Sequence, residues 1–142
     1  MNTFEFSYPV RIDDLDFMGI IGNSEWVTLL TRARIDLLEH IQYPITQMMK
    51  DKIGGVVSEM TIKYMKPAKY GDVLKVEITP HNHFSKGLCL KYIARKNNHE
   101  ICVEADVTII FVDSIGTPVA VPEIVILRLS TPARTPHRAV EN

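Results

Sequence analysis

The sequence predicts a single α+β domain in which an antiparallel sheet wraps around one long helix. Apolar residues recur at three- and four-residue spacing over residues 24–40, which is typical of an amphipathic helix. Five other segments alternate apolar and polar residues with a period of two, which indicates strands with one buried face. Short loops join the last four of these strands, so those strands must pair antiparallel.

The first strand is expected at residues 4–10, and Pro9 places it at a sheet edge or ends it, because proline has no backbone donor. The long helix follows from about Ser24 to His40. A short second helix is expected from Pro44 to Lys52, with Pro44 in its first position and Gly54-Gly55 beyond its end.

The remaining chain is rich in strand patterns. These cover residues 56–64, 74–78, 88–95 and 101–111, with a hairpin loop at 96–99 and a turn at 113–116. Residues 122–129 are compatible with a helix or a strand. We therefore expect one domain over residues 1–130, followed by a flexible polar tail at 131–142.

Composition narrows the function. The chain has 142 residues, 46% of them hydrophobic, which suits one compact soluble domain. A net charge of −1 gives no basic field for nucleic acid or an anionic membrane surface. No Cys/His cluster suggests a metal, and no cofactor is implied.

The cysteines and the N-terminus indicate a cytoplasmic protein. If Asn97-Asn98 forms a two-residue hairpin turn, Cys89 faces about position 106 and Cys102 faces about position 93, so the two thiols are not opposite each other. Two reduced thiols fit a reducing compartment. The N-terminus has no signal-peptide pattern, and no apolar stretch could span a bilayer.

A partner subunit is expected from the same pattern. One helix covers only part of the apolar sheet surface that the alternating strands provide, and large bare apolar patches are rare on monomers. We therefore expect a homo-oligomer, at least a dimer and in our reading a homotetramer.

Two motifs resemble a known family. The segment from Arg11 to Arg34 reads RIDDLDFMGIIGNSEWVTLLTRAR, and residues 64–72 read YMKPAKYGD. In this order and separation they resemble the 4-hydroxybenzoyl-CoA thioesterase-like branch of the hotdog superfamily. The resemblance covers roughly residues 3 to 128. It implies a hotdog fold, acyl-CoA thioesterase activity, and active sites built between subunits.

The resemblance assigns the chemistry to the loop before the long helix. Asp16 is expected to attack the thioester carbonyl or to activate a water molecule. Backbone amides around Ile21, Gly22 and Asn23 are expected to hold the carbonyl oxygen, because a helix N-terminus favours developing negative charge. Many relatives have His at the position of Asn23, which here leaves a backbone role.

Other candidates have plain structural alternatives. Trp26 could line the acyl pocket or belong to the core, and Asp14 could bond loop amides. Glu59 could face an active site shared across a dimer, and Lys86 could meet the CoA phosphates. The structural interpretation of both charges, which we favour for each residue taken alone, is a solvated surface group.

Three functional alternatives remain open at this point. The chain could bind acyl-CoA without hydrolysing it, because a fold alone does not define activity. It could act on an acyl group carried by an acyl carrier protein. A hotdog dehydratase is the third, although no catalytic histidine is visible on the helix.

Overall fold

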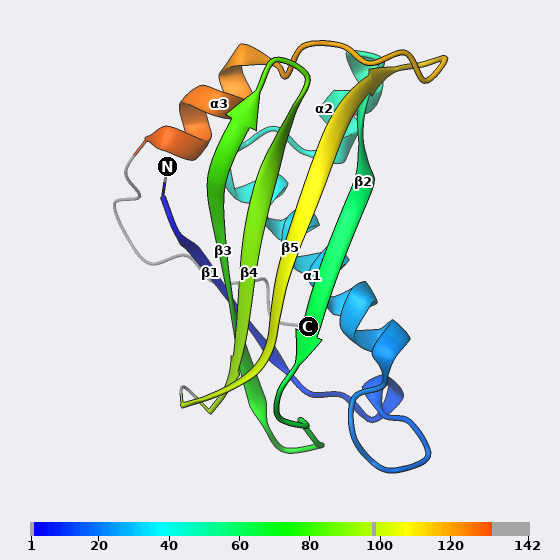
Figure 1. Ribbon diagram of the computed structural model, residues 1–142, viewed down its shortest axis with the longest axis vertical. Coiled ribbons are helices and arrows are strands. Elements are labelled where there is room, and N and C mark those ends of the chain that lie inside the picture. The colour runs from blue at the N-terminus through cyan, green and yellow to red at the C-terminus, as the bar shows by residue number, and fades with distance from the viewer. Residues whose placement is uncertain (1, 98, 132–142) are drawn as a thin grey trace.

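The computed structural model describes residues 2–97 and 99–131 and contains one five-stranded sheet (Figure 1). The strand order is β1-β3-β4-β5-β2, and every pairing is antiparallel. The strands are β1 (Phe4–Pro9), β2 (Ile53–Tyr64), β3 (Val73–Phe84), β4 (Gly87–Lys96) and β5 (Glu100–Asp113). The predicted α+β class is confirmed, as is the position of β1 at a sheet edge.

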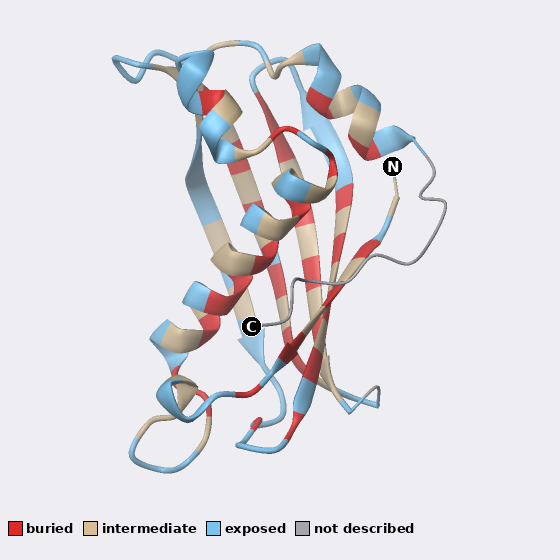
Figure 2. Cartoon of the chain, turned by 180° about the vertical axis from the view of Figure 1, so that it is seen from behind, coloured by how far each residue is buried: buried red, intermediate tan, exposed pale blue. Residues whose placement is uncertain are grey.

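The long helix, α1 (Asn23–His40), lies across one face of the sheet and supplies one side of the core (Figures 1 and 2). Its buried residues recur at helical spacing and point at the strands. They are Trp26, Leu29, Leu30, Ala33 and Leu37. Full burial of each large apolar side chain contributes roughly 2 kcal/mol, so this stripe holds the helix to the sheet.

The second helix, α2 (Ile45–Lys50), is shorter than expected. Pro44 precedes it as the N-cap, with extended backbone angles, and is not its first helical residue. Gly54 and Gly55 do lie beyond its end, but they belong to β2, which begins at Ile53. The expected start of that strand at residue 56 was therefore wrong by three residues.

The hairpin between β4 and β5 has a different register from the one expected. Three residues, not two, separate Lys96 from its partner Glu100, and a bulge at Ala94/Arg95 shifts the register by one more. Cys89 consequently pairs with Thr108 instead of position 106. The two cysteines are nevertheless apart, and both are free thiols.

The face of the sheet that points away from α1 is charged, contrary to the argument for a bare apolar face. Its central positions are half-buried or exposed and include Lys75, Glu77, Lys91, Arg95, Glu104 and Asp106. The buried apolar positions of the strands face the helical side, and a few apolar residues such as Ile93 and Ile110 lie among the charges of the outer face. Two strand edges have no strand partner among the described residues, the outer edge of β1 and the outer edge of the longer β2.

Residues 122–129, which the sequence left open, are largely helical as α3 (Glu123–Ser130). Val125 and Leu129 are buried one turn apart, and Arg128 donates hydrogen bonds to the carbonyls of Ile41 and Gln42 after α1. Within residues 2–97 and 99–131, none of the helices combines the length and apolar character needed to cross a membrane. Residues 132–142 of the expected tail lie outside the described residues.

Candidate active site

The loop between β1 and α1 is folded by its own aspartates. A 3₁₀ turn at Ile12–Asp14 begins it, and the Asp14 carboxylate accepts the Arg11 amide at 2.8 Å. Asp13 forms a two-pronged ion pair with the Arg11 guanidinium, which lowers the pKa of the Asp13 carboxyl. Asp14 therefore has the structural role that was one of its two interpretations.

Asp16 lies at the neck of a small hairpin formed by the rest of the loop. Its amide donates to the Ile20 carbonyl at 2.8 Å, and Leu15 bridges Ile21. Its Oδ1 accepts the Met18 amide at 2.8 Å, while Oδ2 has no hydrogen-bond partner among the described residues. One carboxylate oxygen is thus fixed and the other is free for chemistry.

The turn of this hairpin needs a glycine. Gly19 has φ +79°, a left-handed conformation that side chains disfavour, and its amide donates to the Asp16 carbonyl at 3.0 Å. Phe17 at the tip is 95% exposed. The Asp16 backbone is therefore held from both directions while the tip of the loop points to solvent.

The first turn of α1 presents unpaired amides beside this loop. Gly22 is the N-cap and accepts the Trp26 amide at 3.0 Å, the first bond of the helix. The amides of Asn23, Ser24 and Glu25 donate to no acceptor within the described chain. Such amides, together with the helix dipole, favour an anion or a developing oxyanion.

Gly22 lies between two carboxylates. A Cβ at this position would be 3.5 Å from the Asp16 Cβ and would collide with the Glu25 carboxylate, so only glycine fits without movement. Glu25 is therefore a second acidic residue beside Gly22, and the sequence analysis did not assign it to the site. Its place three residues after the N-cap, where capping-box glutamates occur, was the available signal.

The Ile21 amide is not available to a substrate, which corrects one part of the expectation. It donates to the Ala68 carbonyl at 2.9 Å, and the neighbouring Ile20 bridges Lys69. The Gly22 amide faces the Asp14 carbonyl at a longer 3.4 Å. Of the three expected donors, the structure leaves the amide of Asn23 without an acceptor in the described residues.

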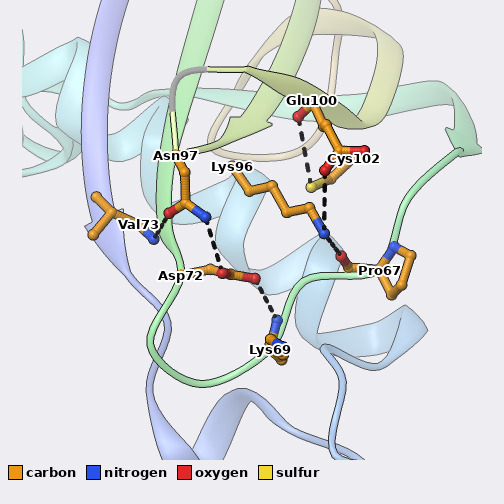
Figure 3. A network of polar contacts seen from close by, with 8 residues as sticks. All are labelled: Pro67, Lys69, Asp72, Val73, Lys96, Asn97, Glu100 and Cys102. Atoms are coloured by element: carbon orange, nitrogen blue, oxygen red, sulfur yellow. Dashed lines mark hydrogen bonds and ion pairs between the residues drawn. The ribbon is translucent and has the colours of Figure 1, made fainter.

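The second motif supports the loop from behind (Figure 3). The Asp72 carboxylate, 8% exposed, accepts the Lys69 amide at 3.0 Å and Asn97 Nδ2 at 3.1 Å. The bond from the Lys69 amide is the main cause that lowers the pKa of the Asp72 carboxyl. Because Ala68 and Lys69 carry the contacts to Ile20 and Ile21, this turn fixes the strand that leads into α1.

Of three expected substrate contacts, Trp26 is part of the core, and Glu59 and Lys86 are not brought to Asp16 within one chain. Trp26 is 3% exposed and lies in the core cluster. Glu59 pairs with Thr108, between the buried Val107 and Ile109, so its side chain lies on the face away from α1. This register follows from a bulge between Val57 and Glu59.

Lys86 lies at the opposite end of the molecule from the Asp16 loop. It follows β3, whose 12 residues begin beside the Asp72 turn, and a strand rises roughly 3.3 Å per residue. Figure 1 shows the β3–β4 hairpin and the loop before α1 at opposite ends of the sheet. Lys86 and Asp16 of one chain therefore cannot contact the same substrate head group.

A long helix held by an antiparallel sheet, with a carboxylate beside its N-terminus, defines the hotdog-fold thioesterases. The chain belongs to the thioesterase-like superfamily, whose family model matches residues 10–129. The expected family is thereby confirmed. Among the groups of at least three His, Cys, Asp or Glu in the described residues, none is arranged to hold a metal ion.

Individual relatives agree with this assignment. The acyl-CoA thioester hydrolase YbgC of Escherichia coli O157:H7 is 32% identical over 133 residues, which cover 89% of this chain and 96% of that protein. The fold is similar to that of Slr0204, a 1,4-dihydroxy-2-naphthoyl-CoA thioesterase from Synechocystis, with a TM-score of 0.84 and 15% identity over 90% of this chain and 96% of that one. It is also similar to SAV2348 from Staphylococcus aureus, solved in complex with CoA, with a TM-score of 0.85 and 14% identity over 94% and 89%.

Proposed function

We propose that this chain hydrolyses an acyl-CoA to the free acid and CoA, with Asp16 as its catalytic carboxylate. The observation that carries the proposal is that Asp16 Oδ2 and the backbone amides at the start of α1 both lack hydrogen-bond partners in the described chain and lie at the same end of the helix. A protein that bound acyl-CoA without hydrolysing it would not need a carboxylate beside the thioester. The family and the YbgC relative support the same reaction.

The reaction needs two contributions from this site. The Asp16 carboxylate, or a water molecule that it deprotonates, forms a bond to the thioester carbon, and the carbonyl oxygen becomes negative. The Asn23 amide and the positive end of α1 stabilise that oxygen. The carbon–sulfur bond then breaks, and the CoA sulfur leaves as a thiolate that takes up a proton. If Asp16 itself attacks, water hydrolyses the resulting anhydride.

Gly22 and Ile21 serve this site indirectly. The absence of a side chain at Gly22 lets the Glu25 carboxylate lie against the start of α1 beside the Asp16 Cβ, a place that a Cβ at position 22 would take. Ile21 holds the entry to the helix through its bond to Ala68. We assign both as positioning residues.

We further propose a homodimer in which β2 pairs antiparallel with β2 of a second copy. This strand is 12 residues long, has no partner on its outer side in the described chain, and exposes Val56, Val57 and Tyr64 by 43–50%. Long apolar sheet edges are covered in native proteins, and a two-fold axis gives this pairing directly. Light scattering should give at least twice the chain mass of 16.1 kDa, and a monomer would refute the pairing.

The tetramer and the cytoplasmic location stay predictions. The charged outer face of the sheet offers polar contacts for a second pair of chains. Two free thiols are compatible with a reducing compartment.

Asp16→Asn tests the catalytic assignment. We expect a fall in kcat of at least about a hundredfold, the usual range for a positioned acid or base, with an unchanged circular dichroism spectrum. Asp13→Asn is the matched control, since Asp13 is exposed and pairs with Arg11. Thiol release from an acyl-CoA panel, and from the same acyl groups on a carrier protein, separates the enzyme from a binder and CoA from carrier-protein substrates. Equal turnover in wild type and a folded Asp16→Asn variant would remove Asp16 from the mechanism.

A further inference from the structure

A cavity of about 280 Å³ lies at the other end of α1 from Asp16. Its walls come from the C-terminal half of α1, from α2 and α3, and from β2, β4 and β5. Lining residues include Leu38, Ile41, Met48, Gly55, Leu90 and Ile109. Part of the rim is open, because Ile35, Ile45 and Met49 are exposed by 38%, 42% and 71%.

Each of the two polar side chains that line this cavity makes one hydrogen bond within the protein. The Thr31 hydroxyl donates to the Val27 carbonyl at 3.0 Å, and Arg34 Nη1 donates to the buried Tyr92 hydroxyl at 3.2 Å. Every other lining side chain is apolar, so no carboxylate, amide or imidazole accepts a polar group of a ligand. The lining is therefore apolar over most of its surface and fits hydrocarbon, and only the Thr31 hydroxyl could accept a bond from a ligand hydroxyl.

One end of β2 lines this cavity, and the other end lies near the Asp16 loop. Its first residues, Ile53 and Gly55, line the cavity, while its last residue, Tyr64, leads into the turn that contacts Ile20 and Ile21. In an antiparallel pair about a two-fold axis, the first residues of one β2 lie against the last residues of the other. The cavity of one chain then opens beside the Asp16 loop of its partner.

We propose that this cavity takes the distal part of a straight alkyl chain, so that the substrate is a medium-chain fatty acyl thioester. The inference rests on the proposed function and names its substrate class. A cavity of about 280 Å³ has room for several methylene groups. Because the carbonyl end of the chain must also reach Asp16, the preferred acyl chain is longer than butanoyl.

The test is a panel of butanoyl-, octanoyl-, dodecanoyl-, hexadecanoyl- and 4-hydroxybenzoyl-CoA. Each buried methylene contributes about 0.8 kcal/mol, so kcat/KM should rise up to about fourfold per carbon and stop rising once the cavity is full. Highest kcat/KM for butanoyl- or 4-hydroxybenzoyl-CoA would overturn the inference and leave thioester hydrolysis intact.

Gly55→Val ties the preference to this cavity. Gly55 pairs with the buried Phe111, so the new side chain points to the cavity side, and its Cβ meets Ile109 Cγ2, another lining atom, at 3.0 Å. Three added carbon atoms should shorten the preferred chain by about three methylenes, since interiors are close-packed. Gly55→Ala, which adds one carbon, serves if the valine variant does not fold.

Gly54→Val is the matched control. The Gly54 backbone also lines the cavity, but Gly54 pairs with Val112, so a side chain there points to the opposite face of the strand, where its Cβ meets no atom within 4 Å. This variant should keep the wild-type order of substrates. The same shift in both variants, or in neither, would overturn the inference.

A binding measurement separates this inference from the proposed function. Calorimetry on the Asp16→Asn variant compares dodecanoyl-CoA with butanoyl-CoA without turnover. Tighter binding of dodecanoyl-CoA that is lost on adding Gly55→Val supports the cavity even if no substrate is hydrolysed. Equal affinities for the two ligands would overturn it even if hydrolysis is fast.

Discussion

Replacing Asp72 by Asn changes a single atom, yet we expect it to cost much of the rigidity of the turn behind Asp16. The Asp72 carboxylate accepts one bond from the Lys69 amide and one from Asn97 Nδ2. The side-chain amide of Asn97 cannot rotate by half a turn to compensate, because its Oδ1 accepts a hydrogen bond from the backbone amide of Val73 at 3.0 Å. An Asn at position 72 has one acceptor atom and one donor group, so in either orientation a donor faces a donor.

The magnitude follows from these two bonds. A hydrogen bond to an ionised group contributes about 1.5–3 kcal/mol and a neutral one about 1 kcal/mol, so losing one and weakening the other lowers the free energy of unfolding by about 3 kcal/mol. Asp72 is 8% exposed, so water does not readily replace the lost partner. In a chain of this size, 3 kcal/mol corresponds to a fall in Tm of roughly 10 °C.

Urea unfolding at one fixed protein concentration measures this difference. The folded-state pKa of Asp72 lies below its unfolded value, so its stabilisation is present above about pH 4 and is lost as the pH falls through the folded pKa. The wild-type and Asp72→Asn curves should therefore converge in acid.

Asp113→Asn is the matched control for Asp72→Asn. Its two bonds, from the amides of Ile115 and Thr117, both reach the same oxygen, Oδ1, which an Asn retains. We expect a cost below about 1 kcal/mol there. If Asp72→Asn costs no more than Asp113→Asn, the reasoning about donor and acceptor placement is refuted.

Three further outcomes are expected. Gly19→Ala places a side chain in left-handed backbone and should cost about 1 kcal/mol and lower kcat, because Gly19 holds the Asp16 carbonyl; an unchanged kcat would contradict this. Tyr43→Phe removes the bond to Asp51 at 2.7 Å and should cost about 1 kcal/mol at neutral pH. Burial, with that bond, raises the pKa of Tyr43 from 10.0 to about 12, so its stabilisation is lost as the pH rises through the folded value. The free energies of unfolding of wild type and variant should differ at pH 7 and converge above pH 10, and equal values at pH 7 would contradict the prediction. A chain that ends at Ser130 should keep the wild-type KM and kcat, and a KM raised tenfold, about 1.4 kcal/mol of binding, would show that residues 131–142 contact the substrate.

Local periodicity was enough to predict most of the fold. The spacing of apolar residues gave α1 to within one residue, because a single helix face is buried along its whole length. The motif before α1 led to Asp16 and Gly22, since a carboxylate at a helix start is a local feature. The helix at residues 123–130 depended on tertiary packing of Val125 and Leu129, which propensity alone could not decide.

The misplaced residues depended on features that sequence period does not encode. The bulge after Val57 reverses the alternation in β2, so Met60 takes the core-facing side and Glu59 the outer one. Lys86 was placed by charge alone, and the length of β3 carries it to the far end of the sheet. The cavity could not be predicted from a local motif, because its lining residues come from six helices and strands that are far apart in the sequence.

The placement of the Asp16 loop and the cavity along α1 predicts that some pairs of inactive alleles complement each other. The Asp16 loop stands at the N-terminal end of this 18-residue helix, whereas the cavity lies along its C-terminal half, from Thr31 onward. In the proposed dimer, each reaction centre draws its carboxylate from one copy and its cavity from the other. An allele damaged at Asp16 and an allele with a blocked cavity should therefore complement each other. Half of randomly mixed two-fold dimers carry both alleles, and each of these has one intact centre, so roughly a quarter of wild-type activity returns. Two alleles damaged at the same end give no such recovery.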